Sequence, residues 1–254
     1  MIKKLAVISH ERSGSSFLIN SIGGHFPDYL LEFGEDNKHQ RVDIDALGWN
    51  FADPEEMRNF LSDSRFHDVA ISNPFKSHHH FDYFKPVWDY VVDQFKVIYI
   101  YRGGRDVLTS FWRHVRKQGF LWGPQTFTVG DFMRAKPSGG VCRYDASPPP
   151  QNMVDRWQQH ILSWMNPMKE EICYVSYEEL SLEFDQTIHR IGRYLEMDIT
   201  GWKGKPKLSG VHPWRGKIGN WKEYFDTPDK MFYGNNAKKA VRLLKEKPFG
   251  RKQT

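Results

Sequence analysis

The sequence predicts an α/β fold, with a mainly parallel central sheet flanked by helices. Three observations support this prediction. Short apolar runs of strand length alternate along the chain with segments whose apolar residues recur at helical spacing. The first apolar run enters a Ser/Gly loop and then a helical segment, which is the beginning of a strand–loop–helix unit. No internal repeat or linker divides the 254 residues, so we expect one domain over residues 1–254.

Four apolar runs have the length of buried strands. The strongest is VIYIY at residues 97–101, because β-branched and aromatic side chains without a charge are typical of a strand buried on both faces. We expect strands over residues 4–9, 69–72, 97–101 and 172–176.

Helical segments alternate with these runs. The first follows the Ser/Gly loop and stops at two glycines, a turn of helix follows Pro54, and Trp157, Ile161 and Trp164 share one helical face. The expected helices cover residues 15–22, 57–61, a stretch after the third strand to about 116, and stretches around 157–165, 184–195 and 237–244. Two segments rich in Gly, Pro or Lys, residues 136–151 and 202–222, are expected to be loops.

Composition narrows the class of protein. A net charge of +5 fits an anionic ligand, a nucleic acid or an acidic surface, and does not distinguish them. Cys142 and Cys173 are far apart in sequence and form neither a disulfide framework nor a metal-binding spacing, which favours a reducing compartment. No apolar run is long enough for a signal peptide or a membrane span. We therefore expect a soluble, cytoplasmic protein without a membrane partner.

The stretch SHERSGSSFL, residues 9–18, has the properties of an anion-binding loop. A small-residue loop between a strand and a helix N-terminus offers backbone N–H groups and the positive end of the helix dipole. Arg12 adds a charge-assisted donor, and Ser13, Ser15 and Ser16 add hydroxyl groups. The phosphate-loop lysine is missing, because Ser15 follows Gly14. A Ser-rich turn that only caps the helix is the simpler alternative.

A second candidate follows the strongest strand. In RGGRD the strand ends at Arg102, two glycines allow a ligand to approach the backbone, and Asp106 suits the start of a helix. Ser110 lies about two helical turns further on, so that it and Arg102 can converge on one anion. A nucleotide kinase would place a metal-binding aspartate after such a strand, and the arginine here favours an anion site instead.

The third candidate is WRGKIGNWKEYFD, residues 214–226. Gly216 and Gly219 with Arg215, Lys217 and Lys222 form a flexible basic loop flanked by tryptophans. Such a loop can close over a charged ligand, and it can equally be a solvated surface loop.

Taken in order, the three stretches resemble the motifs of the cytosolic-type sulfotransferases, which use 3′-phosphoadenosine 5′-phosphosulfate (PAPS). HERSGSSF is similar to the first motif of that family, and Arg102, Arg105, Asp106 and Ser110 match R-x-x-[KR]-D-x-x-x-S. WRGKIGNWK matches the third motif except at its first position, and FKSHHH resembles the lysine–Ser–histidine segment. The resemblance covers nearly the whole chain and implies a single domain with the P-loop NTPase-like sulfotransferase fold.

The resemblance also implies roles for individual residues. It assigns the general base to His78, and Lys76 and Arg12 to stabilising charge on the leaving oxygen. His10 and Glu11 are weaker candidates for the base, and a zinc site at His78, His79 and His80 is disfavoured because neighbours in an extended segment point to opposite faces. The residues implied to bind PAPS or its product PAP are Arg12, Ser13, Gly14, Ser15, Ser16, Arg102, Ser110, Tyr177, Arg215 and Gly216.

Two positions depart from the family pattern. Arg12 replaces the lysine of the first loop, and a guanidinium has a different reach from an ammonium. Trp214 replaces the arginine that opens the third motif, which leaves more of the 3′-phosphate contact to Arg215. No metal is expected, because a sulfuryl group carries less charge than a phosphoryl group.

The acceptor is left open by the sequence. Residues 34–53, 117–132 and 136–151 are rich in aromatic side chains but also carry Asp and Glu, so that a phenol, a sterol, a sugar or a cationic metabolite would fit, at a hydroxyl or an amine. We expect a small-molecule acceptor, no nucleic acid, and a monomer or homodimer. The alternatives are a P-loop small-molecule kinase and a basic nucleic-acid-binding protein, and in the latter the basic residues would gather along one face.

Overall fold

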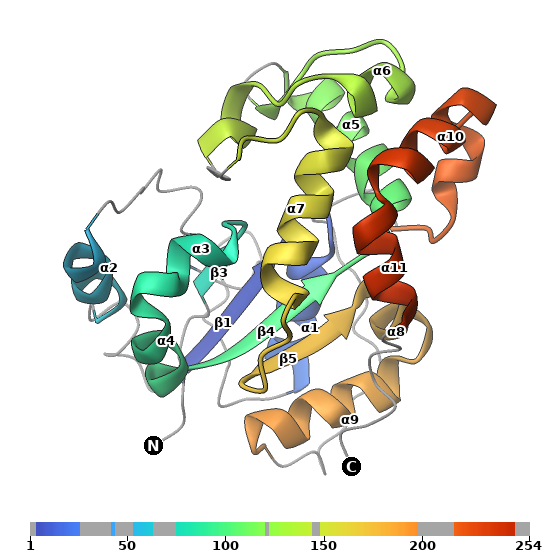
Figure 1. Cartoon of the computed structure of the whole chain (residues 1–254). Helices are drawn as coiled ribbons and strands as arrows, with labels where there is room; N and C mark the ends of the chain where they lie inside the picture. Colours follow the sequence, from blue (N-terminus) through green and yellow to red (C-terminus); the bar gives the residue numbers. More distant parts are fainter. Residues whose placement is uncertain are drawn as a thin grey trace.

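A computed structural model describes residues 4–25, 42–43, 53–62, 75–119, 122–143, 148–197 and 216–246. Within these ranges five strands form one sheet in the order β2-β3-β1-β4-β5, and every neighbouring pair is parallel (Figure 1). This confirms the predicted α/β fold with a parallel sheet. The strands are β1 (Lys4–Ser9), β2 (Val42–Asp43), β3 (Phe75–Ser77), β4 (Phe95–Tyr101) and β5 (Ile172–Ser176).

Helices and short 3₁₀ turns connect the strands. The α-helices are α1 (Ser15–His25), α2 (Pro54–Leu61), α3 (Phe81–Phe84), α4 (Trp88–Gln94), α5 (Gly104–Gln118), α6 (Val129–Arg134), α7 (Met153–Met165), α8 (Tyr177–Leu182), α9 (Phe184–Leu195), α10 (Thr227–Asn236) and α11 (Lys238–Glu246). The 3₁₀ turns are η3 (Lys85–Val87), η5 (Gly139–Arg143) and η6 (Asn220–Glu223). None of the described helices is both long and apolar enough to cross a membrane.

The sheet separates two apolar cores. Along β1, Leu5 and Val7 face a core shared with α1, α8 and α9, whereas Ala6 and Ile8 face the core on the other side. The second core contains apolar side chains of α5, α7 and the C-terminal helices, with Trp157 and Trp164 fully buried. Burial on both faces explains why the strands read as continuous apolar runs.

The order of the strands places the site. β3 and β4 follow each other in sequence but lie on opposite sides of β1, so the strand order reverses at β1. In sheets of this kind ligands bind beyond the carboxyl ends of the strands, where the strand order reverses. The loop after β1 therefore lies at the position where an anion site is expected.

Most expected elements are present, with three exceptions. Residues 69–72 lie outside the described part of the chain, and the strand found there in sequence order is β3 at Phe75–Ser77, which has a polar Lys–Ser pair instead of an apolar run. The described part of the segment expected as a loop, 136–143 and 148–151, contains the 3₁₀ turn η5. The segment expected as a loop over 202–222 is described only from Gly216 onward, where η6 follows a turn.

Candidate active site

The loop after β1 has the backbone of an anion-binding turn. Arg12 and Gly14 have positive φ angles of 66° and 103°, which reverses the chain before α1 begins at Ser15. A Cβ atom on Gly14 would lie 2.5 Å from Cδ2 of Tyr177, so only glycine fits under this ring. The Ser13 hydroxyl is buried without a hydrogen-bond partner among the described residues. A buried orphan donor beside a helix N-terminus is what an oxyanion would satisfy.

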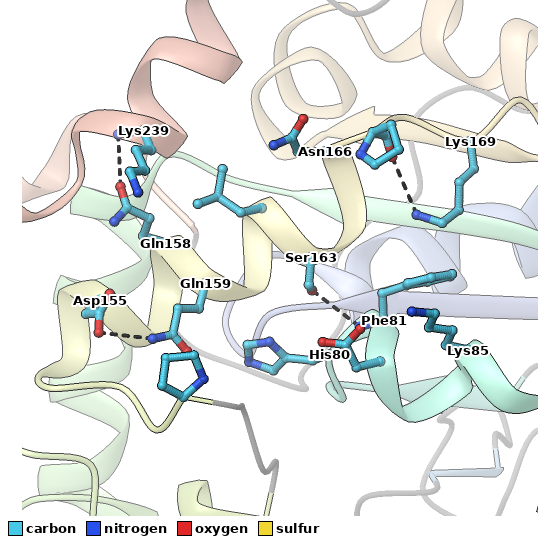
Figure 2. A pocket seen from close by; sticks show the side chains of 14 residues that line it. His80, Phe81, Lys85, Asp155, Gln158, Gln159, Ser163, Asn166, Lys169 and Lys239 are labelled. Atoms are coloured by element: carbon cyan, nitrogen blue, oxygen red, sulfur yellow. Dashed lines mark hydrogen bonds between the residues drawn. The ribbon is translucent and has the colours of Figure 1, made fainter.

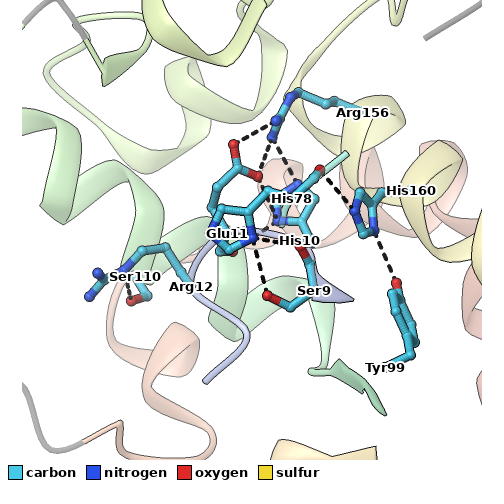
Figure 3. A network of polar contacts seen from close by, with 9 residues as sticks. All are labelled: Ser9, His10, Glu11, Arg12, His78, Tyr99, Ser110, Arg156 and His160. Carbon is cyan, nitrogen blue, oxygen red and sulfur yellow. Dashed lines mark hydrogen bonds and ion pairs between the residues drawn. The ribbon is translucent and has the colours of Figure 1, made fainter. Parts of the chain in front are cut away.

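Two arginines from different motifs meet beside this loop. Nε of Arg12 donates to the Ser110 hydroxyl at 3.3 Å, which joins the first stretch to α5 (Figure 3). Burial, followed by the charge of Arg102, lowers the pKa of Arg12. Among the described residues Arg12 forms no ion pair, so no carboxylate there balances its charge. The second cation, Arg102, lies close enough to affect its pKa. Two neighbouring cations of this kind favour a ligand with more than one negative charge.

A second cluster of contacts joins the end of β4 to the third stretch, and it contains Arg102, Tyr177 and Gly216. The Arg102 guanidinium lies 4.3 Å above the centre of the Tyr177 ring, and its Nη2 donates to the carbonyls of Gly216 and Lys217 at 3.3 Å each. The Tyr177 hydroxyl donates to the same Gly216 carbonyl at 2.9 Å. Nε of Arg102 is buried without a partner among the described residues. The second and third stretches are thus brought together as the sequence predicted, whereas Arg215 lies outside the described residues.

Asp106 does more than cap a helix. Its two carboxylate oxygens accept hydrogen bonds from the backbone N–H groups of Gly219 at 2.8 Å and Trp221 at 3.3 Å. Gly104, expected from the sequence to admit a ligand, is instead packed against Trp157 and Tyr233, each within 2.7 Å of a Cβ placed there. The second stretch therefore serves partly to hold the third in place.

His78 lies beside the end of β1. The register pairs Ile8 with Ser77, so the next residues, Ser9 and His78, come together beyond the strand ends. Nδ1 of His78 lies 2.6 Å from the Ser9 carbonyl oxygen and 3.1 Å from the Ser9 hydroxyl. Because a carbonyl only accepts, Nδ1 carries the proton, and Nε2 is the nitrogen that can accept one. Lys76 is buried in β3 and shares the face of its partner Val7.

The other two histidines of HHH have different environments. Nδ1 of His79 bonds to the Ser77 hydroxyl at 2.8 Å, and its ring stacks on Tyr83 at 3.9 Å. His80 packs edge-on against His160, and burial lowers its pKa to about 3. No group of three or more His, Cys, Asp or Glu side chains in the described part of the chain could hold a metal ion.

His10 is buried and Glu11 is half-buried, and both form contacts that the sequence did not reveal. Arg156 of α7 holds Glu11 through two bonds of 2.9 and 2.6 Å. This ion pair, acting against burial, holds the pKa of Glu11 well below its usual range, so the carboxylate is charged and weakly basic. Burial lowers the pKa of His10 to about 4. An arginine and a histidine at 156 and 160, within an otherwise apolar helix face, were the only sequence signal for these contacts.

A cavity of about 690 Å³ lies along the outward face of α7 (Figure 2). It runs between α3 and α11 and is bordered by His80, Gln159, Ser163, Lys85 and Lys239. His78 and Arg12 do not line it, so it is distinct from the anion site. Of the three segments considered for the acceptor, residues 34–53 lie almost entirely outside the described residues.

Comparison with models of known protein families finds a match over most of the chain. The family model described as "Sulfotransferase domain" matches residues 3–209. No curated protein compared with the chain matches it.

Three solved structures resemble this one over most of their length. Mouse sulfotransferase SULT7A1 complexed with PAP has a TM-score of 0.61 and 15% identity, with 97% of this chain and 88% of that chain covered. Retinol dehydratase in complex with androsterone and PAP has a TM-score of 0.57 and 17% identity, with coverage of 96% and 81%. A sulfotransferase from Alicyclobacillus acidocaldarius has a TM-score of 0.54 and 11% identity, with coverage of 96% and 95%. The fold is therefore that of these proteins, and the match to most of the chain shows that it belongs to the sulfotransferase family.

Proposed function

We propose that the protein transfers the sulfuryl group of PAPS to a hydroxyl or amine of a small-molecule acceptor, and releases PAP. The observation that supports this most directly is the convergence of three separate stretches on one cationic region. Arg12 contacts Ser110, and Arg102 reaches the backbone at Gly216, at the carboxyl ends of β1 and β4. A nucleotide with separate phosphate groups at its 3′ and 5′ positions offers Arg12 the anionic partner that it does not have among the described residues.

The residues present fit such a nucleotide. The Ser13 hydroxyl and Nε of Arg102 are buried donors without partners among the described residues, one in the loop and one beside the third stretch. We assign the 5′-phosphosulfate to Arg12, Ser13, Gly14, Ser15 and Ser16. The 3′-phosphate falls to Arg102, Ser110, Arg215 and Gly216, and Tyr177 borders the adenine. PAP bound to the solved relatives SULT7A1 and retinol dehydratase supports this assignment.

The mechanism assigns His78 as general base. Nε2 takes the proton of the acceptor as its oxygen or nitrogen attacks sulfur, while the bond between sulfur and the bridging oxygen breaks in line. The bond from Nδ1 to the Ser9 carbonyl keeps the imidazole in the tautomer that this step needs. Arg12 and Lys76 would stabilise the negative charge that builds on the departing phosphate. No step in this scheme calls for a metal ion.

A small-molecule kinase is the alternative, and the site does not favour it. Ser15 stands where a kinase of the P-loop type has its lysine, and β4 leads to Arg102 where a metal-binding aspartate would be expected. The same cations serve an anionic donor without a divalent ion.

Replacement of His78 tests the mechanism. In His78→Ala we expect turnover of PAPS, in the presence of a panel of phenols, amines and sugars, to fall by about 10²–10⁴. The dissociation constant of PAP should change by less than about threefold, because the imidazole is assigned to the acceptor side. His189→Ala, an exposed histidine of α9 behind the opposite face of the sheet, is the matched control. Undiminished turnover in His78→Ala would place the base elsewhere.

A further inference from the structure

α7 carries a stripe of three polar donors on its buried face. Arg156, His160 and Trp164 follow each other at intervals of four residues, so they lie along one side of the helix. All three are almost fully buried, at 2%, 1% and 0% exposure. A purely apolar stripe would cover the sheet without the cost of desolvating a guanidinium and an imidazole. Their contacts explain why polar side chains stand here.

Arg156 holds the anion-binding loop. Its guanidinium forms the two-pronged bond to the Glu11 carboxylate and donates a further bond to Nε2 of His10 at 3.0 Å. Nδ1 of His10 in turn donates to the Glu11 carbonyl at 2.9 Å. A two-pronged bond fixes the orientation of both groups as well as their distance. Two successive residues of the loop, directly before Arg12, are therefore fastened to α7.

His160 fixes the backbone at His78, the residue assigned as general base. Its Nε2 donates to the carbonyl of His78 at 3.1 Å, and its Nδ1 accepts from the Tyr99 hydroxyl of β4 at 3.0 Å (Figure 3). One turn further on, Nε1 of Trp164 donates to the carbonyl of His79 at 2.9 Å. Residues 78–80 lie between β3 and α3, outside regular structure. These side chains of α7 thus satisfy buried carbonyls that would otherwise be costly.

We propose that Arg156 and His160 are positioning residues for sulfuryl transfer: through them α7 sets the placement of the His78 imidazole relative to the loop that carries Arg12. This inference rests on the proposed function. Arg156 acts on the loop through Glu11 and His10, and His160 acts on the base through the backbone carbonyl of His78. Displacing a reacting group by about 1 Å can cost roughly 10²-fold in rate, so a shared rigid support for base and donor site has a direct effect on turnover.

Two substitutions of nearly equal size separate positioning from simple packing. In His160→Gln the amide nitrogen reaches about the position of Nε2 and can still donate to the His78 carbonyl. In His160→Asn the shorter amide reaches only the position of Nδ1 and keeps the contact with Tyr99. We expect His160→Gln to retain kcat within about threefold and His160→Asn to lose about tenfold or more, as transfer geometry is lost.

The readout is PAP release from PAPS with the best acceptor of a panel of phenols, amines and sugars, together with PAP binding by calorimetry. The KM for PAPS and the Kd of PAP should stay within about twofold in both variants, because the loop is held separately by Arg156. Ile161→Val, which removes one buried methylene from the same helix, is the control for packing and should leave kcat unchanged.

Distinct outcomes overturn distinct claims. Equal kcat in the Gln and Asn variants, or a loss confined to KM, overturns the positioning role. A wild-type protein that neither binds PAP nor turns over PAPS overturns the proposed function itself. If the His160 variants do not fold, Tyr99→Phe carries the test, because it removes the hydroxyl that fixes His160 and leaves the helix intact. It should lower kcat severalfold at unchanged PAP affinity, and an unchanged kcat would contradict the proposal.

Discussion

At the scale of single residues, Arg12 shows how a substitution can be accommodated. It stands where the family pattern has lysine, and its φ of 66° lies in the left-handed region, which is uncommon for a residue other than glycine. The longer, planar guanidinium reaches Ser110 of α5, a contact that a lysine would make with a different geometry. The loop and α5 are thereby joined through the cation that we assign to the leaving group.

Gly216 gives a prediction at this scale. Its φ is +51°, and a Cβ atom there would lie 1.8 Å from the Tyr177 hydroxyl oxygen. In Gly216→Ala the basic third stretch must move away from Tyr177 and Arg102, so we expect the Kd of PAP to rise by about tenfold or more. Calorimetry measures this directly.

The matched control is a glycine with room around it. Gly234→Ala places a methyl group in α10 where nothing lies within 4 Å, and alanine favours a helix by roughly 0.5–1 kcal/mol. We expect an unchanged PAP affinity and an unchanged or slightly raised Tm. If Gly216→Ala also binds PAP normally, the third stretch does not form the nucleotide site.

At the scale of elements, the start of α5 and the 3₁₀ turn η6 form one unit. The carboxylate of Asp106 accepts hydrogen bonds from two backbone N–H groups, one at the N-cap of η6 and one within it. In Asp106→Asn one of these donors faces an amide nitrogen, so we expect η6 to loosen and the Kd of PAP to rise by roughly tenfold, with little change for ADP, which lacks the 3′-phosphate. Asp185→Asn, an exposed aspartate in the first turn of α9, is the control. Equal weakening of PAP and ADP in Asp106→Asn would contradict this link.

Elements with strong apolar periodicity could be predicted from sequence, and polar ones could not. β4 and β5 coincide closely with the apolar runs at 97–101 and 172–176, since burial on both faces leaves little choice of residue. β3 was missed because it has three residues, two of them polar, and is held by its neighbours β1 and β2. α8 was missed because its start depends on a capping box between Ser176 and Glu179, and not on an apolar stripe.

Some residues of the candidate site could be predicted from the sequence and others could not. Arg12, Ser110, Arg102 and Gly216 were predictable as a group because their spacing resembles a known pattern, and the structure brings them together. Arg156 and His160 were not predictable, because their partners lie 145 and 82 residues away. Contacts of that range depend on how α7 packs against the sheet, which no local pattern specifies.

At the scale of the whole molecule, three buried histidines link stability to pH. Burial lowers the pKa of His10 to about 4 and that of His80 to about 3, and it lowers the pKa of His160 well below its usual value. In the unfolded chain each would titrate near 6.5, so below that pH the unfolded state binds protons that the folded state does not.

Stability should therefore fall as the pH drops from about 6.5 toward 4, by up to about 1.4 kcal/mol per pH unit for each histidine. The low pKa of Glu11 acts in the same direction once the pH passes below its unfolded value. Urea midpoints measured from pH 7.5 to 4.5 test this, and His160→Gln should reduce the slope. A midpoint independent of pH across this range would contradict the neutral, buried state of the three rings.

The proposed function depends on one cationic region that binds a nucleotide with phosphates at both the 3′ and the 5′ position of its ribose. Calorimetric titration of wild type, Arg102→Ala and the exposed control Arg193→Ala with PAP and with ADP, with and without Mg²⁺, tests it most directly. PAP should bind wild type and Arg193→Ala at least about tenfold more tightly than ADP, with the same affinity in the presence and absence of Mg²⁺. In Arg102→Ala the preference for PAP should largely disappear while ADP binding stays the same. Equal affinity for PAP and ADP in the wild type, or tight binding only of a nucleoside polyphosphate with Mg²⁺, would contradict it.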